Sequence, residues 1–558
     1  MVRSVVKGQN GSIPFGQSPP LLSEIIIGLI IRWWVQTKLP IVFDIIGTVL
    51  KIIGLLLLVP GFVSAYYHET SGVVAFALTA MLSICTGIIL SRLGTKGEVG
   101  NKEAFAAVSL GWLAATFFGS LPFVFQGLAL VDALFESVSG FSATGATILS
   151  EANAQGYYIV NSTLVDNSIC TALMNNLDRT LANGGYEVAF SVVNNHTFYG
   201  LLFWRSFQQL IGGLGIILMV VAIFPQLRVA GRQLYRAETV GPSKDTITPR
   251  ATATARILWK VYLLFNGLEI ILLYAAGMPF YDAVCTAFST LATGGFSPQA
   301  SSLVAYKSPI IEAIVAVFII LGMSSFTLHY RVLTSNRLAW FKDEEFRFML
   351  FVLVIATSVL LLAGGIDGDL ATKFRFASFQ VISFMGTCGF VNSLDYDKWS
   401  TAAKLALIMV MLTGGCIGST AGGIKVGRLL VDCKYAYNEL LHMLHPHALM
   451  SVRLGEARVQ EGILRPMLFY SFFYLAVWLA LSLGLAMVSS GDPRVDLQVV
   501  AAGIASCMGG VGPAYGIITF DWSQIGAAGK MIGFFAMYIG RLELMPVFLL
   551  FIPELWRK

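Results

Sequence analysis

Four glycine-rich turns set the strongest limit on how this chain can fold. They lie at 139–147, 290–297, 385–390 and 508–513, and each follows a short, mostly apolar run. A helix needs ~20 residues to cross a bilayer, so each run is predicted to be a re-entrant helix that ends in a turn. Non-helical backbone is tolerated at membrane depth only inside protein or along an aqueous cavity, because bare N–H and C=O groups in lipid are costly. Four such turns indicate one shared watery path.

The composition is typical of a membrane protein that crosses the bilayer many times. Hydrophobic residues make up 56% of the 558 residues, charged residues only 12%, and the mean hydropathy is +0.73. Apolar runs recur from Ile41 to the C-terminus, which leaves no space for a separate soluble domain. The net charge of +5 comes from basic residues in short loops between these runs. The positive-inside rule explains that placement, so the chain is predicted to lie in a membrane and to bind no nucleic acid.

The predicted fold class is an all-α polytopic membrane protein with about ten spanning helices. Four repeated units, each a helix, a pore loop and a second helix, are expected to surround one central pore, with two extra spans at the N-terminus. The predicted segments are a cytoplasmic or interfacial segment (1–40), the two extra spans (41–100), the first unit (101–224), a cytoplasmic linker with the second unit (225–334), the third unit with a broken helix (335–436), and a cytoplasmic linker with the fourth unit (437–558).

Two segments lie outside this repeat. In the N-terminal segment, a short apolar run at 25–31 precedes Arg32, Trp33 and Trp34, an order that indicates an interfacial anchor rather than a signal peptide. The first unit carries a polar, Asn-rich insertion at 151–196, which is predicted to form an external cap or loop. The linkers between units are basic, so the positive-inside rule places them and both termini in the cytoplasm. The glycine turns then enter from outside.

Further motifs accompany the turns in a fixed order. They are 203–206 (FWRS), 212–216 (GGLGI), 414–426 (GGCIGSTAGGIKV) and 540–543 (GRLE). With the four turns, this set resembles the Trk/Ktr/HKT superfamily of potassium transporters over nearly the whole chain after residue 40. The two spans ahead of the first unit make it most similar to the bacterial TrkH branch rather than to KtrB. The insertion at 151–196 departs from that family, which leaves the outer vestibule open.

The glycine turns are predicted to form a selectivity filter. A dehydrated monovalent cation needs oxygens in place of its water shell, and rings of backbone carbonyls supply them. Glycine permits the backbone dihedrals that such a turn requires. Alignment of the repeats makes Gly145, Gly294, Gly389 and Gly512 equivalent, and glycine at all four positions implies, by the resemblance, that potassium is the substrate. The predicted filter residues are Ala143, Thr144, Gly145, Ala292, Thr293, Gly294, Thr387, Cys388, Gly389, Gly510, Val511 and Gly512.

A glycine-rich interruption is predicted in the second helix of the third unit. Residues 413–423 contain five glycines, each about 1 kcal/mol less favourable in a helix than alanine, so a flexible loop is expected at mid-membrane below the filter. The resemblance implies that this loop is a gate, whereas close packing of small residues between helices is the alternative. The predicted gate residues are Gly414, Gly415, Cys416, Gly418, Ser419, Thr420, Gly422, Gly423, Lys425 and Arg541.

Charged residues in the apolar runs have several interpretations. Arg541 lies in the last run, between Met531 and Ile552, and an intramembrane arginine faces a cavity or a partner. The resemblance implies an electrostatic constriction beneath the filter. The alternative is a pair with Glu269 or with Glu543, although Glu543 lies only two residues away and points in a different direction. Three acids near the starts of re-entrant helices are read as helix caps, or as groups that contact ions: Asp132, Asp282 and Asp496.

Potassium uptake driven by the membrane potential is the leading functional hypothesis, with no cofactor required. The alternatives are a sodium- or proton-coupled symporter of KtrB type and, in another class, a membrane-embedded enzyme. An enzyme is disfavoured because the intramembrane charges form no recognisable acid–base or metal set. The lack of a GxxxxGK[ST] motif argues against a self-contained pump. The resemblance also implies a homodimer on a cytosolic, TrkA-like nucleotide-binding ring. The basic linkers 225–260 and 425–465 are the expected docking surface.

Overall fold

The computed structural model describes residues 39–150, 198–222 and 251–556, except for 96, 98, 336, 448–450 and 456. Nearly all of the N-terminal segment 1–40, including the expected anchor, lies outside the described residues. The insertion at 151–196 and the basic stretch 225–250 lie outside them as well.

The described part of the chain is helical apart from one hairpin of two-residue strands, β1 (Arg453–Leu454) and β2 (Ala457–Arg458). The expectation of an all-α membrane protein is therefore confirmed. Six helices, or seven with one bent pair, are long and apolar enough to cross a membrane among the described residues. The expected ten spans would therefore have to include shorter helices. The six candidates are Leu39–Tyr66 (α2 Leu39–Leu56 with α3 Leu58–Tyr66), α4 (Thr70–Leu93), α5 (Asn101–Phe125), α10 (Ala251–Ala275), α15 (Glu344–Ala363) and α19 (Glu461–Val488).

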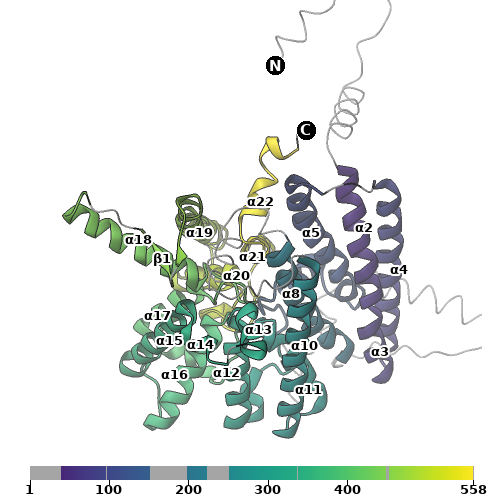
Figure 1. Ribbon diagram of the computed structural model, residues 1–558. Helices are drawn as coiled ribbons and strands as arrows, with labels where there is room; N and C mark the ends of the chain where they lie inside the picture. The colour runs from purple at the N-terminus through teal and green to yellow at the C-terminus, as the bar shows by residue number, and fades with distance from the viewer. Residues whose placement is uncertain are drawn as a thin grey trace, which may run out of the picture.

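The first two candidate spans lie at one side of the molecule, next to α5 (Figure 1). They approach each other through glycine: a Cβ built on Gly47 of α2 would lie 2.6 Å from the carbonyl oxygen of Gly87 in α4. The hydroxyl of Ser83 also donates to the carbonyl of Leu50 at 2.8 Å. Small residues at such a contact allow two backbones to pack closely, which is how helices associate where lipid provides no hydrophobic driving force.

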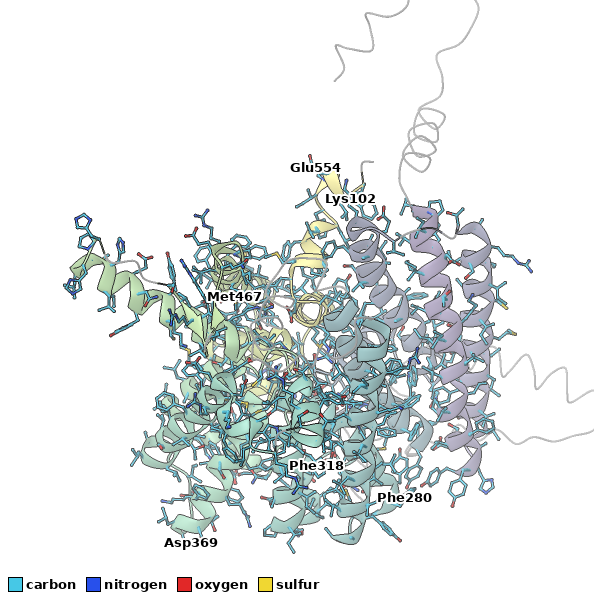
Figure 2. All side chains as sticks on the ribbon, in the orientation of Figure 1. Lys102, Phe280, Phe318, Asp369, Met467 and Glu554 are labelled. Carbon is cyan, nitrogen blue, oxygen red and sulfur yellow. The ribbon has the colours of Figure 1, made fainter. Side chains whose placement is uncertain are left out.

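Four short helices end at the four glycine turns, as predicted. They have 12, 12, 16 and 13 residues, so none could cross a bilayer alone. These helices are α6 (Leu130–Phe141), α11 (Phe280–Leu291), α16 (Leu370–Met385) and α20 (Leu497–Gly509). Phe280 and Asp369, at the starts of α11 and α16, lie at the end of the molecule opposite to Lys102 and Glu554 (Figure 2).

The helices that follow three of these turns are broken, whereas the sequence predicted a break only in the third unit. That prediction was incomplete. In the second unit, α12 (Pro309–Met323) and α13 (Phe326–Thr334) meet at 101°. In the third, α17 (Thr401–Thr413) and α18 (Val426–Leu444) are separated by the glycine-rich loop, and α18 runs outward from the bundle (Figure 1). In the fourth, α21 (Ala527–Arg541) stops before the short α22 (Met545–Leu549).

Local chemistry accounts for the two breaks that the sequence did not predict. The hydroxyl of Ser324 donates to the carbonyl of Ile320 at 2.6 Å, a side-chain bond that often bends helices. After Arg541, the residues Glu543 and Leu544 have φ of +57° and +56°, and Pro546 follows. The positive φ of these two residues interrupts the helix, so α21 ends, and Pro546 lies in the first turn of α22, where its missing N–H has no helical partner to lose. Arg541 is consequently the last residue of α21. The sequence predicted instead that it lies inside a span that reaches Ile552.

Of the three acids expected to cap re-entrant helices, only Asp496 does so. Its carboxylate accepts the N–H of Val499 at 2.8 Å, one of the free donors at the start of α20. Asp132 and Asp282 lie inside the first turns of α6 and α11, whose N-cap residues are Ala129 and Pro279, so neither acid occupies the predicted capping position. Asp132 instead pairs with Lys530 of α21 at 2.6 Å. The buried Asp282 accepts the hydroxyl of Tyr306 at 2.8 Å.

Replacement of the capping residue tests this assignment. Asp496→Ala is expected to lower the free energy of unfolding by about 1 kcal/mol, because the N–H of Val499 loses its acceptor. The midpoint of thermal unfolding in detergent measures the change. Asp367→Ala, at an exposed position in the loop before α16, is the matched control and is expected to leave the midpoint unchanged. Equal midpoints for the two variants would contradict the capping role.

The turn between α3 and α4 is fixed to the start of α8 (Tyr199–Ala222) by Glu69. Its carboxylate accepts the N–H groups of Tyr199 and Gly200, which otherwise have no helical partner. Burial nevertheless raises the pKa of Glu69 to about 7 from an ordinary value of 4.5. A raised carboxyl pKa means that the folded protein holds the proton more tightly than the unfolded chain. The stability from this group is therefore complete below pH 4.5 and is lost as the pH rises through 7.

A pH dependence of thermal stability follows from Glu69. The unfolding temperature of the wild type is expected to be higher at about pH 5 than at about pH 8, and Glu69→Gln is expected to narrow that difference because it removes the titrating group. Thermal unfolding in detergent at both values measures it. A pH dependence of the same size in the variant would show that other groups cause it.

Candidate functional site

The four glycine turns share one backbone geometry. In each, the carbonyl of a buried serine accepts the N–H of the residue five positions later, at 2.8–2.9 Å. These donor and acceptor pairs are Thr144 to Ser139, Gly294 to Ser289, Cys388 to Ser383 and Val511 to Ser506. The residue after each donor is a glycine with positive φ: Gly145 (+84°), Gly295 (+70°), Gly389 (+80°) and Gly512 (+98°). Positive φ favours glycine at these four positions, although Ala143, Thr293 and Thr387 of the same turns also have φ of +51° to +55°.

This geometry corrects the register that the sequence alignment gave for the second unit. Gly294 was expected to be equivalent to the other three glycines. Its N–H bonds to Ser289 as that of Thr144 bonds to Ser139, so Gly294 corresponds to Thr144 and Gly295 to Gly145. The carbonyl of Gly294 also accepts a hydrogen bond from Gln209 at 2.8 Å. The turn of the second unit is therefore 293–295 and not 292–294.

The four turns form a closed ring, because each glycine faces the carbonyl of the next turn. A Cβ built on Gly145 would lie 2.2 Å from the carbonyl oxygen of Gly294. The corresponding distance from the built Cβ to the carbonyl oxygen is 1.8 Å for Gly295 and Cys388, 1.8 Å for Gly389 and Val511, and 2.7 Å for Gly512 and Thr144. The contacts run from the first turn to the second, third and fourth, and back to the first. Gly145, Gly389 and Gly512 of the first, third and fourth turns thus each face the next turn, and Gly295 completes the set. We call this arrangement the four-turn ring.

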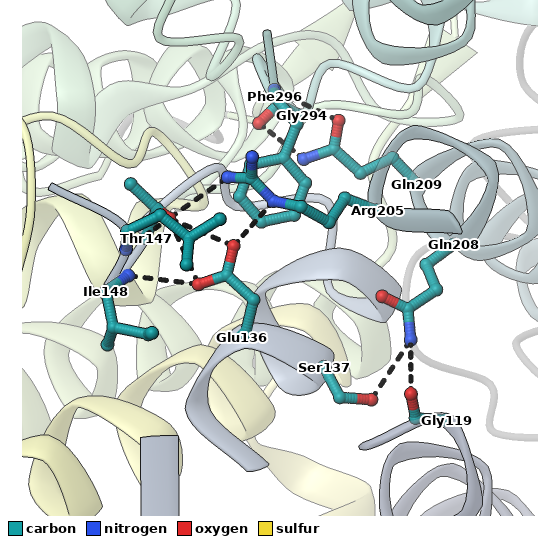
Figure 3. A network of polar contacts seen from close by, with 11 residues as sticks. Gly119, Glu136, Ser137, Thr147, Ile148, Arg205, Gln208, Gln209, Gly294 and Phe296 are labelled. Atoms are coloured by element: carbon teal, nitrogen blue, oxygen red, sulfur yellow. Dashed lines mark hydrogen bonds and ion pairs between the residues drawn. The ribbon is translucent and has the colours of Figure 1, made fainter. Parts of the chain in front are cut away.

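A buried ion pair lies beside the ring (Figure 3). Nε of Arg205, on α8, is 2.6 Å from Oε1 of Glu136, on α6, and neither side chain is more than 2% exposed. Arg205 Nη2 donates to the hydroxyl of Thr147 at 3.0 Å, and this hydroxyl donates to Glu136 at 2.9 Å. The second carboxylate oxygen of Glu136 accepts the N–H of Ile148 at 3.0 Å. Both carboxylate oxygens of Glu136 and Nη2 of Arg205 therefore contact residues just after the first turn.

Two glutamines of α8 extend this network (Figure 3). Gln209 donates to the carbonyl of Gly294 and accepts the N–H of Phe296 at 3.2 Å, so it holds both sides of the second turn. Gln208 donates to the hydroxyl of Ser137 at 3.1 Å and to the carbonyl of Gly119 at 3.2 Å. The sequence analysis did not assign a role to Glu136 or Gln209. The signal was partial: Arg205 belongs to the FWRS motif at 203–206, but the motif gives no indication of what the arginine contacts.

The glycine-rich loop at 414–425 lies against the ends of the short helices. The hydroxyl of Thr420 donates to the carbonyls of Leu291 at 2.8 Å and Gly322 at 3.0 Å. The N–H of Gly422 donates to the hydroxyl of Thr387, in the third turn, at 2.9 Å. A Cβ on Gly422 would lie 2.0 Å from the carbonyl oxygen of Gly509, at the end of α20. The loop thus contacts the turns or helix ends of three units.

Most of the other predicted gate residues lie within this loop. Positive φ values at Gly414 (+72°), Gly418 (+80°) and Gly423 (+79°) explain why the segment cannot be helical. The N–H of Cys416 donates to the carbonyl of Met323 at 2.8 Å, which fixes the loop to the bend between α12 and α13. The remaining predicted members lie in or beside the loop and are buried or half-buried: Gly415, Ser419 and Lys425.

Arg541 touches the loop from α21. Its Nη1 donates to the carbonyl of Thr420 at 2.7 Å, and the side chain is 6% exposed. Among the described residues, Nε and Nη2 of Arg541 have no hydrogen-bond partner, and neither Glu269 nor Glu543 forms an ion pair with it. Glu543 pairs instead with Arg428 of α18 at 2.6 Å. The alternative of a structural pair for Arg541 is therefore wrong within the part of the chain that the structure describes.

Comparisons with known proteins identify relatives of this chain. A family model described as TrkH, cation transport protein, matches residues 73–558. The Trk system potassium uptake protein TrkH of Salmonella typhimurium is 32% identical over 91% of this chain and 99% of its own length. Its counterpart in Halomonas elongata is 32% identical over 93% of this chain and all of its own length. The crystal structure of the potassium transporter TrkH from Vibrio parahaemolyticus superposes with a TM-score of 0.77, at 26% identity, over 93% of this chain and all of that chain.

These matches decide between the functional classes left open by the sequence. The family consists of transport proteins, so the prediction that the chain is a transporter and not a membrane-embedded enzyme is confirmed. The resemblance drawn from the glycine turns and the four further motifs is confirmed too, because the match extends over most of the chain. The chain belongs to the TrkH family of cation transport proteins.

Proposed function

We propose that this protein takes up potassium across the inner membrane through the four-turn ring, which acts as its selectivity filter. The observation that carries the proposal is the closure of the ring by four glycine turns with one geometry. Such a ring brings backbone carbonyls of four turns around a single axis, which is the chemistry that replaces the water shell of a potassium ion. Relatives that are 32% identical bear the name potassium uptake protein.

The proposed architecture has ten spans in all, with four units around the pore and two extra N-terminal spans. The broken second helices of the units then count as spans, although among them only the bent pair α12 and α13 passes a test of length and composition. Both termini are cytoplasmic in this proposal. Support comes from Lys102, after a basic loop, which lies at the same end as Glu554, near the C-terminus, and opposite to the starts of α11 and α16 (Figure 2). The short helices would then enter from outside.

The proposed filter consists of residues Ala143, Thr144, Gly145, Thr293, Gly294, Gly295, Thr387, Cys388, Gly389, Gly510, Val511 and Gly512. No cofactor is needed for ions to pass, because the membrane potential contributes about 2.3 kcal/mol per charge per 100 mV. The glycine-rich loop and Arg541 form the proposed gate. Their hydrogen bond lies next to the ends of the short helices, where a closed loop would obstruct an ion that leaves the filter.

The proposed partners are a second copy of this chain and a cytosolic, TrkA-like nucleotide-binding ring. The feature that supports a partner is α18, which runs outward from the bundle (Figure 1). Its outer half exposes Tyr437, Leu440, Met443 and Leu444, each by 62–78% of the residue surface. A contiguous apolar surface of that kind marks a site of contact with another protein or with lipid.

Growth and flux measurements test the proposed function. The full chain is expected to restore growth at low potassium to a host that lacks potassium uptake. Reversal potentials of the reconstituted protein under imposed potassium, sodium and pH gradients then separate passive uptake from symport. A reversal potential that follows the potassium gradient alone indicates passive conduction, and one that shifts with pH or sodium supports the coupled alternative. Absence of any potassium flux from a folded protein would contradict the proposal.

A further inference from the structure

The ion pair of Glu136 and Arg205 does more than connect the helices α6 and α8, because it also links two turns of the ring. Glu136 accepts the N–H of Ile148 and the hydroxyl of Thr147, which directly follow the first turn. On the other side, the guanidinium carbon of Arg205 lies 4.1 Å from the centroid of the Phe296 ring, directly after Gly295 in the second turn. A single buried pair therefore bridges the first and second turns (Figure 3).

The fourth unit has no counterpart of this ion pair. Gly212 of α8 and Gly540 of α21 occupy equivalent places, since a Cβ on each would lie 2.1 Å from the carbonyl oxygen of the residue two positions after the buried serine, Phe141 or Met508. This equivalence places Gly533 at the position of Arg205 and Gly503 at that of Glu136. The fourth unit thus has glycine at both positions, and its turn has no such bridge.

A charged pair in this location needs a reason. Removal of two ions from water is costly, and an apolar pair of similar volume would often be at least as stable. An apolar pair makes no directional contacts. A guanidinium, in contrast, has a rigid fork of hydrogen-bond donors, and a carboxylate has two oriented acceptors. Here, Nε and Nη2 of Arg205 and both oxygens of Glu136 are used at 2.6–3.1 Å. The position of the first turn is therefore fixed along several directions at once.

Arg205 and Gln209 act on the same turn from the same helix. They are four residues apart on α8 and lie on one face, and Gln209 holds the carbonyl of Gly294 and the N–H of Phe296. Arg205 covers the ring of that phenylalanine. We propose that Arg205, oriented by Glu136, is a positioning residue that sets the spacing of the first and second turns and thereby the discrimination between potassium and sodium. This inference rests on the proposed function of the four-turn ring.

The test is the ratio of potassium to sodium permeability, from reversal potentials of the full chain reconstituted in liposomes. Arg205→Gln is expected to lower this ratio about tenfold, since hydrogen bonds to a charged group are lost on both sides. Arg205→Lys keeps the charge but not the fork or the stacking, so an intermediate ratio is expected. Glu136→Gln leaves Arg205 without its anion and is expected to resemble Arg205→Gln. A wild-type ratio in folded Arg205→Gln would overturn the inference.

A milder variant keeps the test valid if the charge variants do not fold. Phe296→Leu leaves the ion pair intact and removes only the ring over Arg205, so the protein is expected to fold and the ratio to fall about threefold. Arg375→Gln is the matched control, because Arg375 is half-exposed, 3.5 Å from Glu312, and Glu312 keeps a hydrogen bond from Asn392. The ratio of this control is expected to equal that of the wild type.

One further variant separates failure of the inference from failure of the proposed function. Gly389→Ala alters the ring itself and is expected to abolish the discrimination. If Gly389→Ala lowers the ratio while Phe296→Leu and Arg205→Gln do not, the ring is the filter and the positioning role is wrong. If the folded wild type shows no preference for potassium and Gly389→Ala changes nothing, the proposed filter itself is wrong.

Discussion

Replacement of Gly295 by alanine is expected to abolish the preference for potassium over sodium. The backbone at Gly295 has a φ of +70°, which is unfavourable for alanine by about 1–2 kcal/mol on its own. The new Cβ would also lie 1.8 Å from the carbonyl oxygen of Cys388 and 2.8 Å from its carbonyl carbon. Backbone atoms of the third turn would have to move, because no flexible side chain can give way. A fall of at least about tenfold in the permeability ratio is expected.

Gly294→Ala is the matched control for this prediction. The two glycines are neighbours, but Gly294 has no positive φ, and a Cβ there would meet the end of the Gln209 side chain at 2.4–2.7 Å. That side chain can rotate away at the cost of its hydrogen bonds, so a smaller loss of selectivity is expected than for Gly295→Ala. Reversal potentials with potassium and sodium on opposite sides measure both. A larger loss in Gly294→Ala would restore the register that the sequence alignment gave.

The error in that register has an identifiable cause. The second turn contains two adjacent glycines, and a Thr-Gly step at 293–294 matches the Thr-Gly step at 144–145. The residue that fixes the geometry lies earlier: Ser289 accepts the N–H of Gly294 as Ser139 accepts that of Thr144. A serine stands at this position in all four units, so an alignment that started from the serines would have found Gly295. Matching of the glycines alone could not identify Gly295.

The presence and length of the short helices could be predicted from the sequence, since their limit is the thickness of the bilayer. The break after Thr413 was also predictable, because five glycines in eleven residues destabilise any helix. The bend at Ser324 and the end of α21 at Arg541 were not. Both lie in apolar runs, and the breaks depend on a single serine and on the positive φ of Glu543 and Leu544.

Long-range polar contacts mark the limit of sequence analysis for the site. Asp132 and Asp282 stand near helix starts in the sequence, yet one pairs with Lys530 and the other accepts from Tyr306. Glu136 and Arg205 meet only because α6 and α8 pack together. The sequence shows which residues carry charge, whereas the packing of helices far apart in the chain decides which charges meet.

Arg541→Ala is expected to raise potassium flux about tenfold without a change in selectivity. Its Nη1 holds the carbonyl of Thr420, so the variant loses a charge-assisted hydrogen bond that fixes the loop at 414–425 beneath the ring. It also removes a positive charge that would repel a cation leaving the ring. The four turns are untouched, because no hydrogen bond of Arg541 reaches them among the described contacts. Flux of a potassium tracer and reversal potentials measure the two effects separately.

Arg541→Lys separates the two causes, because lysine keeps the positive charge and loses the planar fork. If repulsion dominates, the lysine variant retains low flux; if the bond to Thr420 dominates, its flux rises toward that of alanine. The ion pair of Glu543 with Arg428 and the hydrogen bonds of Thr420 to Leu291 and Gly322 remain in both variants, so the loop keeps other anchors. Equal flux in the wild type and both variants would exclude Arg541 from the gate, because neither its charge nor its hydrogen bond would then limit the passage of ions.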